Sequence, residues 1–410
     1  MSSATEPAAS TSGPDADGII VGASFAGIEV LYQLQRRLAD RPPRVLVIDR
    51  VREHGYIPLM QERLVDALPA ARSLLHTAAW IDAQPRTRFV QGEVTDVDVD
   101  AHAVVLADGR RFEARVLVLA VGSELVPPPS LPGHERLLSH KSAAQFERLQ
   151  AALGEALGDG EGTPELVVIG GGISGVELAA ELAALRDRPA RPWPRAPHVT
   201  LVGADARLVP NLEPVITARV AQVLASLGVD VRLGTRVAAV GEDRVTLHAD
   251  DGEHVLPCAL AMWAGGIRPA PLLATLALPK TAQGWLAVSP TLQCFASRER
   301  DDPTIFACGD AVRIVGGEGE WPTMQRAIEC LWQAKVVARN VAAVLSAESA
   351  EQVPPLQPHR FRPRFAYGVS LGPHSLVLWG RWCVDLPRIN RWFRRWLMRQ
   401  YFARYELPPS

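Results

Sequence analysis

Short apolar runs recur along the chain and mark two similar units. In the first unit, an apolar strand at 18–21 leads through a glycine-containing turn into an apolar-periodic segment at 28–38, and a second strand ends at Asp49. The same order returns about 150 residues later, with strands at 166–169 and 199–202 on either side of a helix. Each stretch predicts a strand–helix–strand unit. The sequence therefore predicts an α/β fold with two Rossmann-like dinucleotide-binding domains.

Alternating apolar and polar residues predict antiparallel strands in two further stretches. Residues 89–122 alternate around the turn signal Asp108-Gly109, and residues 231–265 alternate around Asp251-Gly252. Such dipeptides are typical of β-hairpins. A strand at 305–310 then leads toward a helix expected from about Pro322 to Leu345, and the Pro-rich stretch 351–363 is interpreted as a linker.

These elements predict two nested domains and a small C-terminal region. The first 17 residues are small, polar and acidic, so we expect a disordered leader and a cytoplasmic protein. The predicted order is a leader at 1–17, a first dinucleotide-binding domain at 18–135, an inserted second domain at 136–255, the rest of the first domain at 256–345, and a C-terminal region at 346–410.

Composition and charge narrow the class of protein. The chain has 410 residues, of which 48% are hydrophobic, and a formal net charge of -2, which offers no overall attraction for nucleic acid. No stretch approaches the roughly 18 apolar residues that span a bilayer. The five cysteines lack CxxC spacing, so neither a metal site nor a disulfide framework is predicted. We expect a soluble or peripherally membrane-bound globular protein without a nucleic-acid partner.

The first glycine motif, VGASFAG, has the residues of a pyrophosphate-binding turn. Gly22 supplies the tight turn after the strand, and Gly27 permits close packing of helix on strand. Ser24 stands where a glycine usually lets the backbone approach a phosphate, and its hydroxyl can donate to one. Asp49, at the end of the next strand, is placed to accept a hydrogen bond from an adenosine ribose.

The second motif, VVIGGGISGVELAAEL, is complete. Gly170, Gly172 and Gly175 follow a strand and open a helix whose N-terminus can hold a pyrophosphate. Gly203 stands where an acidic residue would select the free 2'-hydroxyl of NADH. Arg207 is a candidate for the 2'-phosphate of NADPH, so the choice between NADH and NADPH stays open.

With the strand ends LVLAVGS and IFACGDA, the two motifs resemble the two-dinucleotide-binding-domain flavoproteins over about residues 17–345. The resemblance implies FAD in the first domain, NAD(P)H in the inserted domain, and hydride transfer between them. It places Ala120, Val121 and Gly122 in the passage between the domains, and Gly309 with Asp310 on the ribityl and phosphate part of FAD. The disulfide-reducing branches are disfavoured because no cysteine precedes Cys258.

Within this family the chain resembles the type II NADH:quinone oxidoreductases and the apoptosis-inducing-factor-like group. The segment HGYIPLMQERLVD is similar to their stretch beside the isoalloxazine, with Tyr56, Pro58, Leu59 and Met60 matching. The resemblance implies that Glu177 lies near the nicotinamide and the quinone entry. The alternative for Glu177 is a glutamate favoured by the helix N-terminus.

A second stretch carries the same resemblance with one departure. Where these quinone reductases have AQxAxQ, this chain has Met324 to Glu329, in which Gln325 and Ala327 match and are implied to face the flavin. Glu329 replaces the second glutamine. The resemblance thus implies Glu177 and Gln325 as the catalytic residues, with Glu329 beside them at the quinone site.

The C-terminal segment at 388–402 has the pattern of an amphipathic helix. One face carries apolar and aromatic residues and the other arginines, as in helices that lie in a membrane interface. The alternative is that the aromatic face packs on the flavin domain or on a second subunit, which leaves a homodimer open. The apolar face is predicted from Ile389, Trp392, Phe393, Trp396, Leu397 and Tyr401, and the basic face from Arg388, Arg391, Arg394, Arg395 and Arg399.

The resulting hypothesis is an FAD-dependent NAD(P)H dehydrogenase that passes electrons to a quinone. It is expected in the cytoplasm, with a candidate peripheral site on the inner face of the cell membrane. Two alternatives stay open. One is a reductase of a ferredoxin-like or rubredoxin-like protein, and the other is a redox-sensing flavoprotein that binds NAD(P)H.

Overall fold

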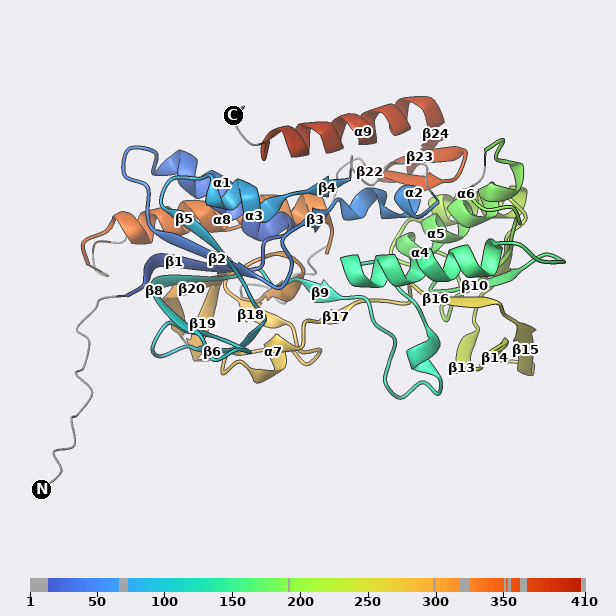
Figure 1. Ribbon diagram of the computed structural model, residues 1–410, viewed down its shortest axis with the longest axis horizontal. Coiled ribbons are helices and arrows are strands. Elements are labelled where there is room, and N and C mark those ends of the chain that lie inside the picture. Colours follow the sequence, from blue (N-terminus) through green and yellow to red (C-terminus); the bar gives the residue numbers. More distant parts are fainter. Residues whose placement is uncertain are drawn as a thin grey trace, which may run out of the picture. The chain divides into compact units, whose positions relative to one another are not determined.

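The chain forms two compact units, each assembled from segments that are distant in the sequence (Figure 1). The computed structural model describes residues 14–65, 73–190, 192–297, 300–316, 325–349, 352, 355–361 and 367–406. The first unit comprises Met1–Arg52, His76–Gly122 and Pro269–Phe361, and the second comprises Glu53–Leu75, Ser123–Arg268 and Arg362–Ser410.

A largely parallel sheet forms the centre of the first unit. Strand β1 lies between β2 and β8, and both neighbours run parallel to it. Its residues Ile19, Ile20 and Val21 are buried, as expected of a strand covered on both faces. The sheet comprises β1 (Ala16–Val21), β2 (Val45–Asp49), β5 (Thr87–Gln91), β6 (Val94–Asp98), β7 (Ala103–Leu106), β8 (Arg111–Leu119), β18 (Leu286–Val288), β19 (Gln293–Ser297), β20 (Arg300–Ala307) and β21 (Val312–Ile314).

Two long helices pack against each other in the first unit, α1 (Phe25–Arg37) and α8 (Ala327–Ser346) (Figure 1). The buried stripe of α1 contains Ile28, Leu31 and Leu34, which recur at helical spacing. The shorter helices are α3 (Thr77–Asp82), α7 (Leu272–Thr275) and the 3-10 turn η5 (Gly309–Ala311).

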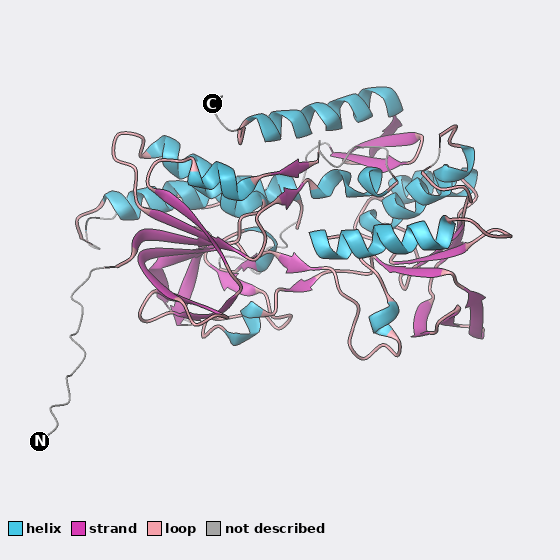
Figure 2. Cartoon of the chain, in the orientation of Figure 1, coloured by secondary structure: helices cyan, strands magenta, loops and turns pink. Residues whose placement is uncertain are grey.

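The second unit contains a parallel sheet in the order β12-β11-β10-β16 and smaller antiparallel sheets. Figure 2 shows these strands in magenta among the helices that cover them. The strands are β3 (His54–Gly55), β4 (Leu74–Leu75), β9 (Ser123–Glu124), β10 (Glu165–Ile169), β11 (His198–Val202), β12 (Asp230–Arg232), β13 (Arg236–Val240), β14 (Arg244–Ala249), β15 (Gly252–Pro257), β16 (Leu260–Trp263), β17 (Arg268–Pro269), β22 (Tyr367–Leu371), β23 (His374–Trp379) and β24 (Trp382–Asp385).

One apolar core joins distant segments of the second unit. It contains Leu64, Phe146, Leu178 and Leu376, which come from four different parts of the chain. Ser142 and Gln145 form a capping box at the start of α4, which fixes where that helix begins. The helices are α2 (Met60–Leu64), α4 (Ala143–Leu157), α5 (Ile173–Ala183), α6 (Pro214–Ser226) and α9 (Pro387–Ala403), with the 3-10 turns η1 (Ile57–Leu59), η3 (His134–Arg136) and η4 (Ala184–Asp187).

The direction of some strands differs from the sequence prediction. Within the stretches 89–122 and 231–265, antiparallel pairing is confined to β6–β7–β8 and β13–β14–β15, whereas β5 and the end of β8 pair in parallel with β2 and β1. The reason lies in β8 itself. Its first half alternates in burial and pairs with β7, while its second half is an unbroken buried run at 116–119 that enters the parallel sheet. In the same way, β12 and β16 belong to the parallel sheet of the second unit.

Several predicted boundaries also differ. The leader ends before residue 17, because β1 begins at Ala16, and residues 1–13 lie outside the described part of the chain. Helix α8 begins at Ala327, and the predicted start at Pro322 lies outside the described residues. The predicted C-terminal region at 346–410 is divided, because its residues up to 361 belong to the first unit and residues 362–410 belong to the second, where β22 and β23 join the core.

The segment interpreted as a linker also has a defined place in the first unit. In its described part, 355–361, the residue His359 is buried, and its main-chain N–H donates to the carbonyl of Pro290 (2.7 Å). The amide of Asn340 on α8 exchanges hydrogen bonds with the main chain of Gln357 (3.0 and 2.9 Å). The proline-rich composition therefore reflects a stretch without regular structure that is nevertheless fixed to α8.

Candidate functional site

The first glycine turn brings β1, α1 and the end of β8 into close contact. Gly22 has a φ of 104°, and a Cβ added there would lie 2.4 Å from the carbonyl oxygen of Ala120. A Cβ on Gly27 would lie 1.8 Å from the carbonyl oxygen of Gly22. Only glycine fits at both positions. The turn therefore brings the N-terminus of α1 directly after β1, and main-chain N–H groups in the first turn of a helix can bind a pyrophosphate.

Ser24 and Asp49 complete this turn. Ser24 is the N-cap residue of α1, although its hydroxyl makes no capping hydrogen bond. The carboxylate of Asp49 accepts hydrogen bonds from the main-chain N–H groups of Ala23 (2.6 Å) and Val51 (3.1 Å). Each carboxylate oxygen has further lone pairs, so Asp49 holds the turn and can still accept a bond from a ribose hydroxyl.

The other residues assigned to FAD in this unit gather around the same helix end. A Cβ on Gly309, whose φ is 82°, would lie 3.2 Å from the Cβ of Ala26 on α1. The side-chain amide of Gln325 donates to the main-chain carbonyl of Asp310 (3.3 Å). Gln325 has a φ of 42°, and Ala327, the first residue of α8, follows it closely. Ala120 contacts the turn at Gly22, and Val121 and Gly122 follow directly.

The arrangement fits FAD. A diphosphate needs backbone donors, which the start of α1 provides. A ribose and a ribityl chain need polar acceptors, which are provided by one carboxylate at the end of β2 and a second in η5. The structure brings together ten of the residues predicted from the sequence in this unit: Gly22, Ser24, Gly27, Asp49, Ala120, Val121, Gly122, Gly309, Asp310 and Gln325, with Ala327 beside them. Pro58 belongs to the second unit.

The second glycine motif repeats the geometry of the first. A Cβ on Gly175 would lie 1.8 Å from the carbonyl oxygen of Gly170, whose φ is 131°. Gly172 caps α5, and a Cβ there would meet nothing within 4 Å. This open space above the helix N-terminus is where a pyrophosphate fits. The motif thus has the shape required for NAD(P)H.

At the end of β11, the backbone at Gly203 lies close to the second glycine turn. A Cβ on Gly203 would lie 3.0 Å from Leu233 and 3.5 Å from the Cα of Gly171, so a larger residue would push on the glycine turn. Arg207, half-buried, donates through its guanidinium to the main-chain carbonyl of Pro210. It retains further N–H donors for a phosphate.

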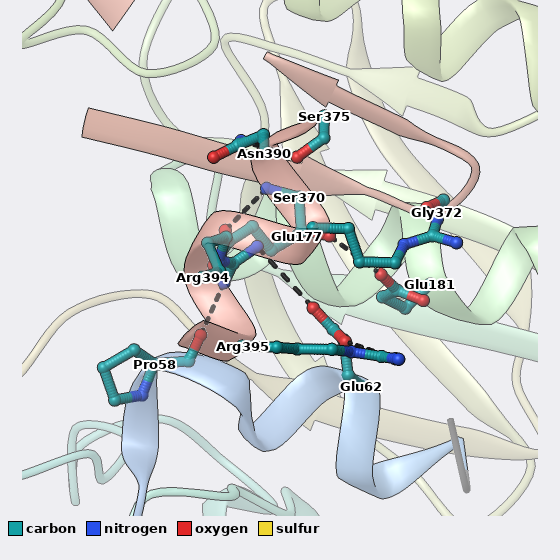
Figure 3. Close-up of polar contacts among 11 residues, drawn as sticks. Pro58, Glu62, Glu177, Glu181, Ser370, Gly372, Ser375, Asn390, Arg394 and Arg395 are labelled. Atoms are coloured by element: carbon teal, nitrogen blue, oxygen red, sulfur yellow. Dashed lines mark hydrogen bonds and ion pairs between the residues drawn. The ribbon is translucent and has the colours of Figure 1, made fainter. Parts of the chain in front are cut away.

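Glu177 belongs to a buried cluster of charged side chains in the second unit (Figure 3). Its carboxylate accepts from the main-chain N–H of Ser370 on β22 (2.9 Å) and lies 3.6 Å from Arg394 on α9. The guanidinium of Arg394 also donates to the carbonyl of Pro58 (2.5 Å) and lies 3.8 Å from Glu62. One arginine therefore ties α5 to the segment predicted to lie beside the isoalloxazine.

Helix α9 covers the rest of that segment. The ring of Tyr56 packs on Tyr401 (centroids 5.5 Å apart) and Phe402 (5.8 Å), and burial raises the pKa of Tyr56 to about 12. Leu59 packs against Met398. The sequence left open whether the apolar face with Tyr401 packs on the protein or on a membrane, and it assigned Arg394 to the opposite, basic face. Both lie on the stripe that faces the protein.

Glu181 lies one turn after Glu177 in the same cluster, and its pKa is raised. Burial and, next, the nearby carboxylate of Glu62 raise the pKa of Glu181 from 4.5 to about 7, against the opposing effects of Ser370 and two arginines. Since the folded protein binds this proton more tightly than the unfolded chain, the carboxyl contributes stability below about pH 4.5, and that stability is lost as pH rises through about 7.

Replacing Glu181 by Gln is therefore expected to stabilise the protein at high pH. The gain over the natural protein should grow by roughly 2 kcal/mol between about pH 5.5 and about pH 8.5, because the variant no longer ionises there. Urea unfolding at both pH values measures it. The matched control is Glu155→Gln at an exposed position of α4, which should show no such growth. An equal gain at both pH values for the Glu181 variant would contradict the assignment.

Three site residues carried no sequence signal strong enough to single them out. Gln333 is fully buried on α8 and accepts from the main-chain N–H of Gly309 (2.8 Å). His359 lies in the supposed linker and contacts Glu329 (2.6 Å). Arg394 was counted as one of many arginines. The only available hint was the spacing of Glu329 and Gln333, a polar i, i+4 pair in an otherwise apolar helix.

The cysteines take no part in a disulfide. All five are free, and Cys308 and Cys330 are buried. Burial raises the pKa of the Cys308 thiol to about 12, as expected of a core residue. The described part of the chain contains no group of three or more His, Cys, Asp or Glu that could hold a metal ion.

Two Rossmann-like units, each with a glycine turn at a helix N-terminus, define an oxidoreductase that binds two dinucleotides. The chain matches the family model of the pyridine nucleotide-disulphide oxidoreductases over residues 16–334, and it belongs to that family. FAD and NAD(P)H are its cofactors. The predicted family and α/β fold are confirmed.

Individual relatives place the chain among flavoprotein reductases. The demethylphylloquinone reductase NdbB of Synechocystis is 27% identical over 378 residues, which cover 88% of this chain and 86% of that protein. The nitric oxide reductase FlRd-NAD(+) reductase of Pectobacterium atrosepticum is 28% identical over 308 residues, 73% of each chain. The solved structure of NDH2 from Plasmodium falciparum in complex with NADH has a TM-score of 0.78, covers 95% of each chain and is 13% identical, which shows a shared fold.

Proposed function

We propose that this protein oxidises NAD(P)H and passes the electrons to a quinone at the surface of a membrane. The family supplies the flavin and nicotinamide chemistry, and a relative that covers most of the chain is named as a reductase of demethylphylloquinone. The observation that carries the proposal is the exposed aromatic surface of the C-terminal segment, because biological quinones with long tails reside in lipid.

The residues of the chain bind and orient the two dinucleotides. The turns at Gly22 and Gly170 present backbone N–H groups to the pyrophosphates, and Asp49 and Asp310 fix a ribose and the ribityl chain. When bound, FAD accepts the hydride of NAD(P)H and carries the redox chemistry. We assign Gln325 to the flavin ring and Glu177 to the nicotinamide end, where its contact with Arg394 keeps the carboxylate in place.

Helix α9 exposes the side chains that suit a membrane interface. Trp392 is 64% exposed and Ile389 is 63% exposed, although both are large and apolar, and Trp379 and Trp382 on the hairpin of β23 and β24 are as exposed. Such patches mark interaction sites, and Trp is favoured at the level of lipid headgroups. We call this set the aromatic surface. It comprises Trp379, Trp382, Val384, Ile389, Trp392, Phe393, Trp396 and Leu397.

Exposed arginines accompany the aromatic surface. Arg388, Arg391 and Arg399 are exposed on α9, where they can meet anionic headgroups, whereas Arg394 and Arg395 turn toward the protein. Among the described helices, none is both long and apolar enough to cross a membrane. The proposal is therefore attachment to the surface of the bilayer, with α9 lying along it.

Vesicles that contain a long-chain quinone test whether a quinone is the electron acceptor and whether the protein acts at a membrane surface. Flavin reduced anaerobically with NADH or NADPH should be reoxidised rapidly by quinone in anionic vesicles, and the protein should sediment with them. The double variant Trp392→Ser/Trp396→Ser should react with a short-chain soluble quinone as the natural protein does. It should lose at least about ten-fold in rate with the vesicle quinone, because it has lost apolar area that inserts.

The outcomes separate the candidate acceptors. If neither quinone reoxidises the flavin, the quinone proposal is wrong, and an electron-transfer protein such as the one named for the Pectobacterium relative becomes the acceptor to test. If both quinones react equally with both proteins, quinone reduction stands and the membrane surface is wrong.

A further inference from the structure

Reduction of a quinone needs one proton that NAD(P)H does not deliver. A quinone becomes a quinol by gaining two electrons and two protons, whereas NAD(P)H gives up two electrons and one proton together as a hydride. The second proton must reach the second quinone oxygen from the protein or from water. In the described part of the first unit, a buried pair of side chains is suited to hold such a proton.

Glu329 and His359 form this pair. The Nε2 of His359 lies 2.6 Å from the Oε1 of Glu329, and each side chain is only 2% exposed. Glu329 is in the first turn of α8, four residues after Gln325, at the position where the resembling quinone reductases carry a glutamine. This buried position therefore holds a group that can take up and release a proton, which a neutral amide cannot do.

The pair is linked to the residues assigned to FAD. The side-chain amide of Gln333 donates to the same Oε1 of Glu329 (3.2 Å), and its oxygen accepts from the main-chain N–H of Gly309 (2.8 Å). The second carboxyl oxygen of Glu329, Oε2, is buried and has no hydrogen-bond partner among the residues that the structure describes. A carboxyl group whose second oxygen is unbound retains one atom from which a proton can leave.

One proton makes the pair neutral. The contact of 2.6 Å joins a carboxyl oxygen and an imidazole nitrogen, and a proton on either atom balances the charge of the pair. An ionised glutamate beside a neutral histidine would leave a net negative charge in the interior, which is costly.

We propose that Glu329 and His359 supply the second proton of quinone reduction. The quinone gains a hydride equivalent from the reduced cofactor, which forms one O–H bond. The proton of the pair forms the other O–H bond, and the pair is left with a net charge of minus one until it takes up a proton from water. The inference rests on the proposed quinone activity and adds to it a proton source particular to this chain.

The variant Glu329→Gln tests the proposal. It has nearly the shape of glutamate and keeps an oxygen that accepts from Gln333 and lies beside His359, so the fold and flavin content should be retained, but it has no acidic proton to give. Turnover with a soluble quinone should fall at least about ten-fold, the lower range for loss of a general acid. Turnover with ferricyanide, which takes electrons and no protons, should stay within about two-fold.

Two further measurements separate a proton-supplying role from a structural one. The solvent deuterium isotope effect on quinone turnover should rise in Glu329→Gln, and Glu329→Asp should recover part of the lost rate. His359→Gln should show the same selective loss with quinone. Equal losses with ferricyanide and quinone in these variants, or no loss with quinone, would overturn the proposal.

The natural protein keeps this test separate from that of the proposed function. If the natural protein reduces ferricyanide but no quinone, the proposed function fails and this inference fails with it. If the natural protein reduces quinone and Glu329→Gln does so equally well, only the proton-supplying pair is wrong.

Discussion

Replacing Arg394 by alanine is expected to lower the free energy of unfolding by about 3 kcal/mol, the cost of leaving a buried charge without its partner. The guanidinium lies between Glu62 and Glu177, whose side chains are 6% and 11% exposed. It also satisfies the carbonyl of Pro58. Without it two carboxylates stay buried near each other, and α9 loses one of its polar attachments to the unit.

Urea unfolding measures this loss, and the same helix provides the control. Arg399→Ala removes an exposed arginine of α9 and should change stability by less than about 0.5 kcal/mol. Combining Arg394→Ala with Glu177→Gln should recover part of the loss, since one unpaired charge is removed. If Arg394→Ala and Arg399→Ala are equally mild, the cluster does not hold α9 in place.

The variant Gly27→Ala is expected to purify with little or no flavin. The added Cβ would lie 1.8 Å from the carbonyl oxygen of Gly22 and 3.2 Å from Ile20, so α1 must move away from β1. Overpacking of this kind costs at least about 1–3 kcal/mol, and here it displaces the helix end that binds the pyrophosphate. We expect flavin content to fall to about one tenth or less, measured by the visible absorbance of the purified protein.

A neighbouring glycine gives the matched control. Gly18 lies in β1, and a Cβ there would meet only the carbonyl oxygen of Val116 at 3.8 Å, an ordinary contact. Gly18→Ala should keep its flavin. A yellow Gly27→Ala protein with full flavin content would show that the first turn tolerates a side chain, and that α1 is not held to β1 as tightly as the structure indicates.

The glycine turns lie where the sequence predicted them because much of their geometry is local. Gly27 and Gly175 lie against Gly22 and Gly170, five positions earlier, so the spacing of the motif carries this information. Gly22 and Gly170 also lie against Ala120 and Ala264, at the ends of neighbouring parallel strands. The ends of the parallel strands then bring Asp49 and Gly309 to the same side of the sheet. These are the parts of the site that a single sequence can specify.

The C-terminal helix shows what a periodic pattern leaves undetermined. The helix predicted at 388–402 is present as α9, but the pattern could not tell which stripe faces the protein. Tyr401 is buried because it meets Tyr56, and Arg394 is buried because two glutamates and a carbonyl need it. Those partners lie more than 200 residues earlier in the chain, and the sequence of the helix itself does not predict them.

Glu329 shows the same limit in the first unit. Its position was predicted from a motif, but its partner His359 lies in a stretch whose prolines favoured a linker. Burial of a histidine in an irregular segment depends on contacts such as the one from its main chain to Pro290. Tertiary structure, rather than local propensity, decides that pairing.

The place of β8 in the sheet bears on how the newly made chain folds. One edge of its second half pairs with β1, which is synthesised earlier, but the other edge pairs with β20, whose residues Ile305 to Ala307 emerge from the ribosome only after the whole inserted domain. Until then the apolar run Leu117 to Leu119 has an unpaired edge, which is prone to pair with another chain. A nascent chain of this protein therefore depends on the rapid folding of the insertion, and on the arrival of β20, to escape aggregation.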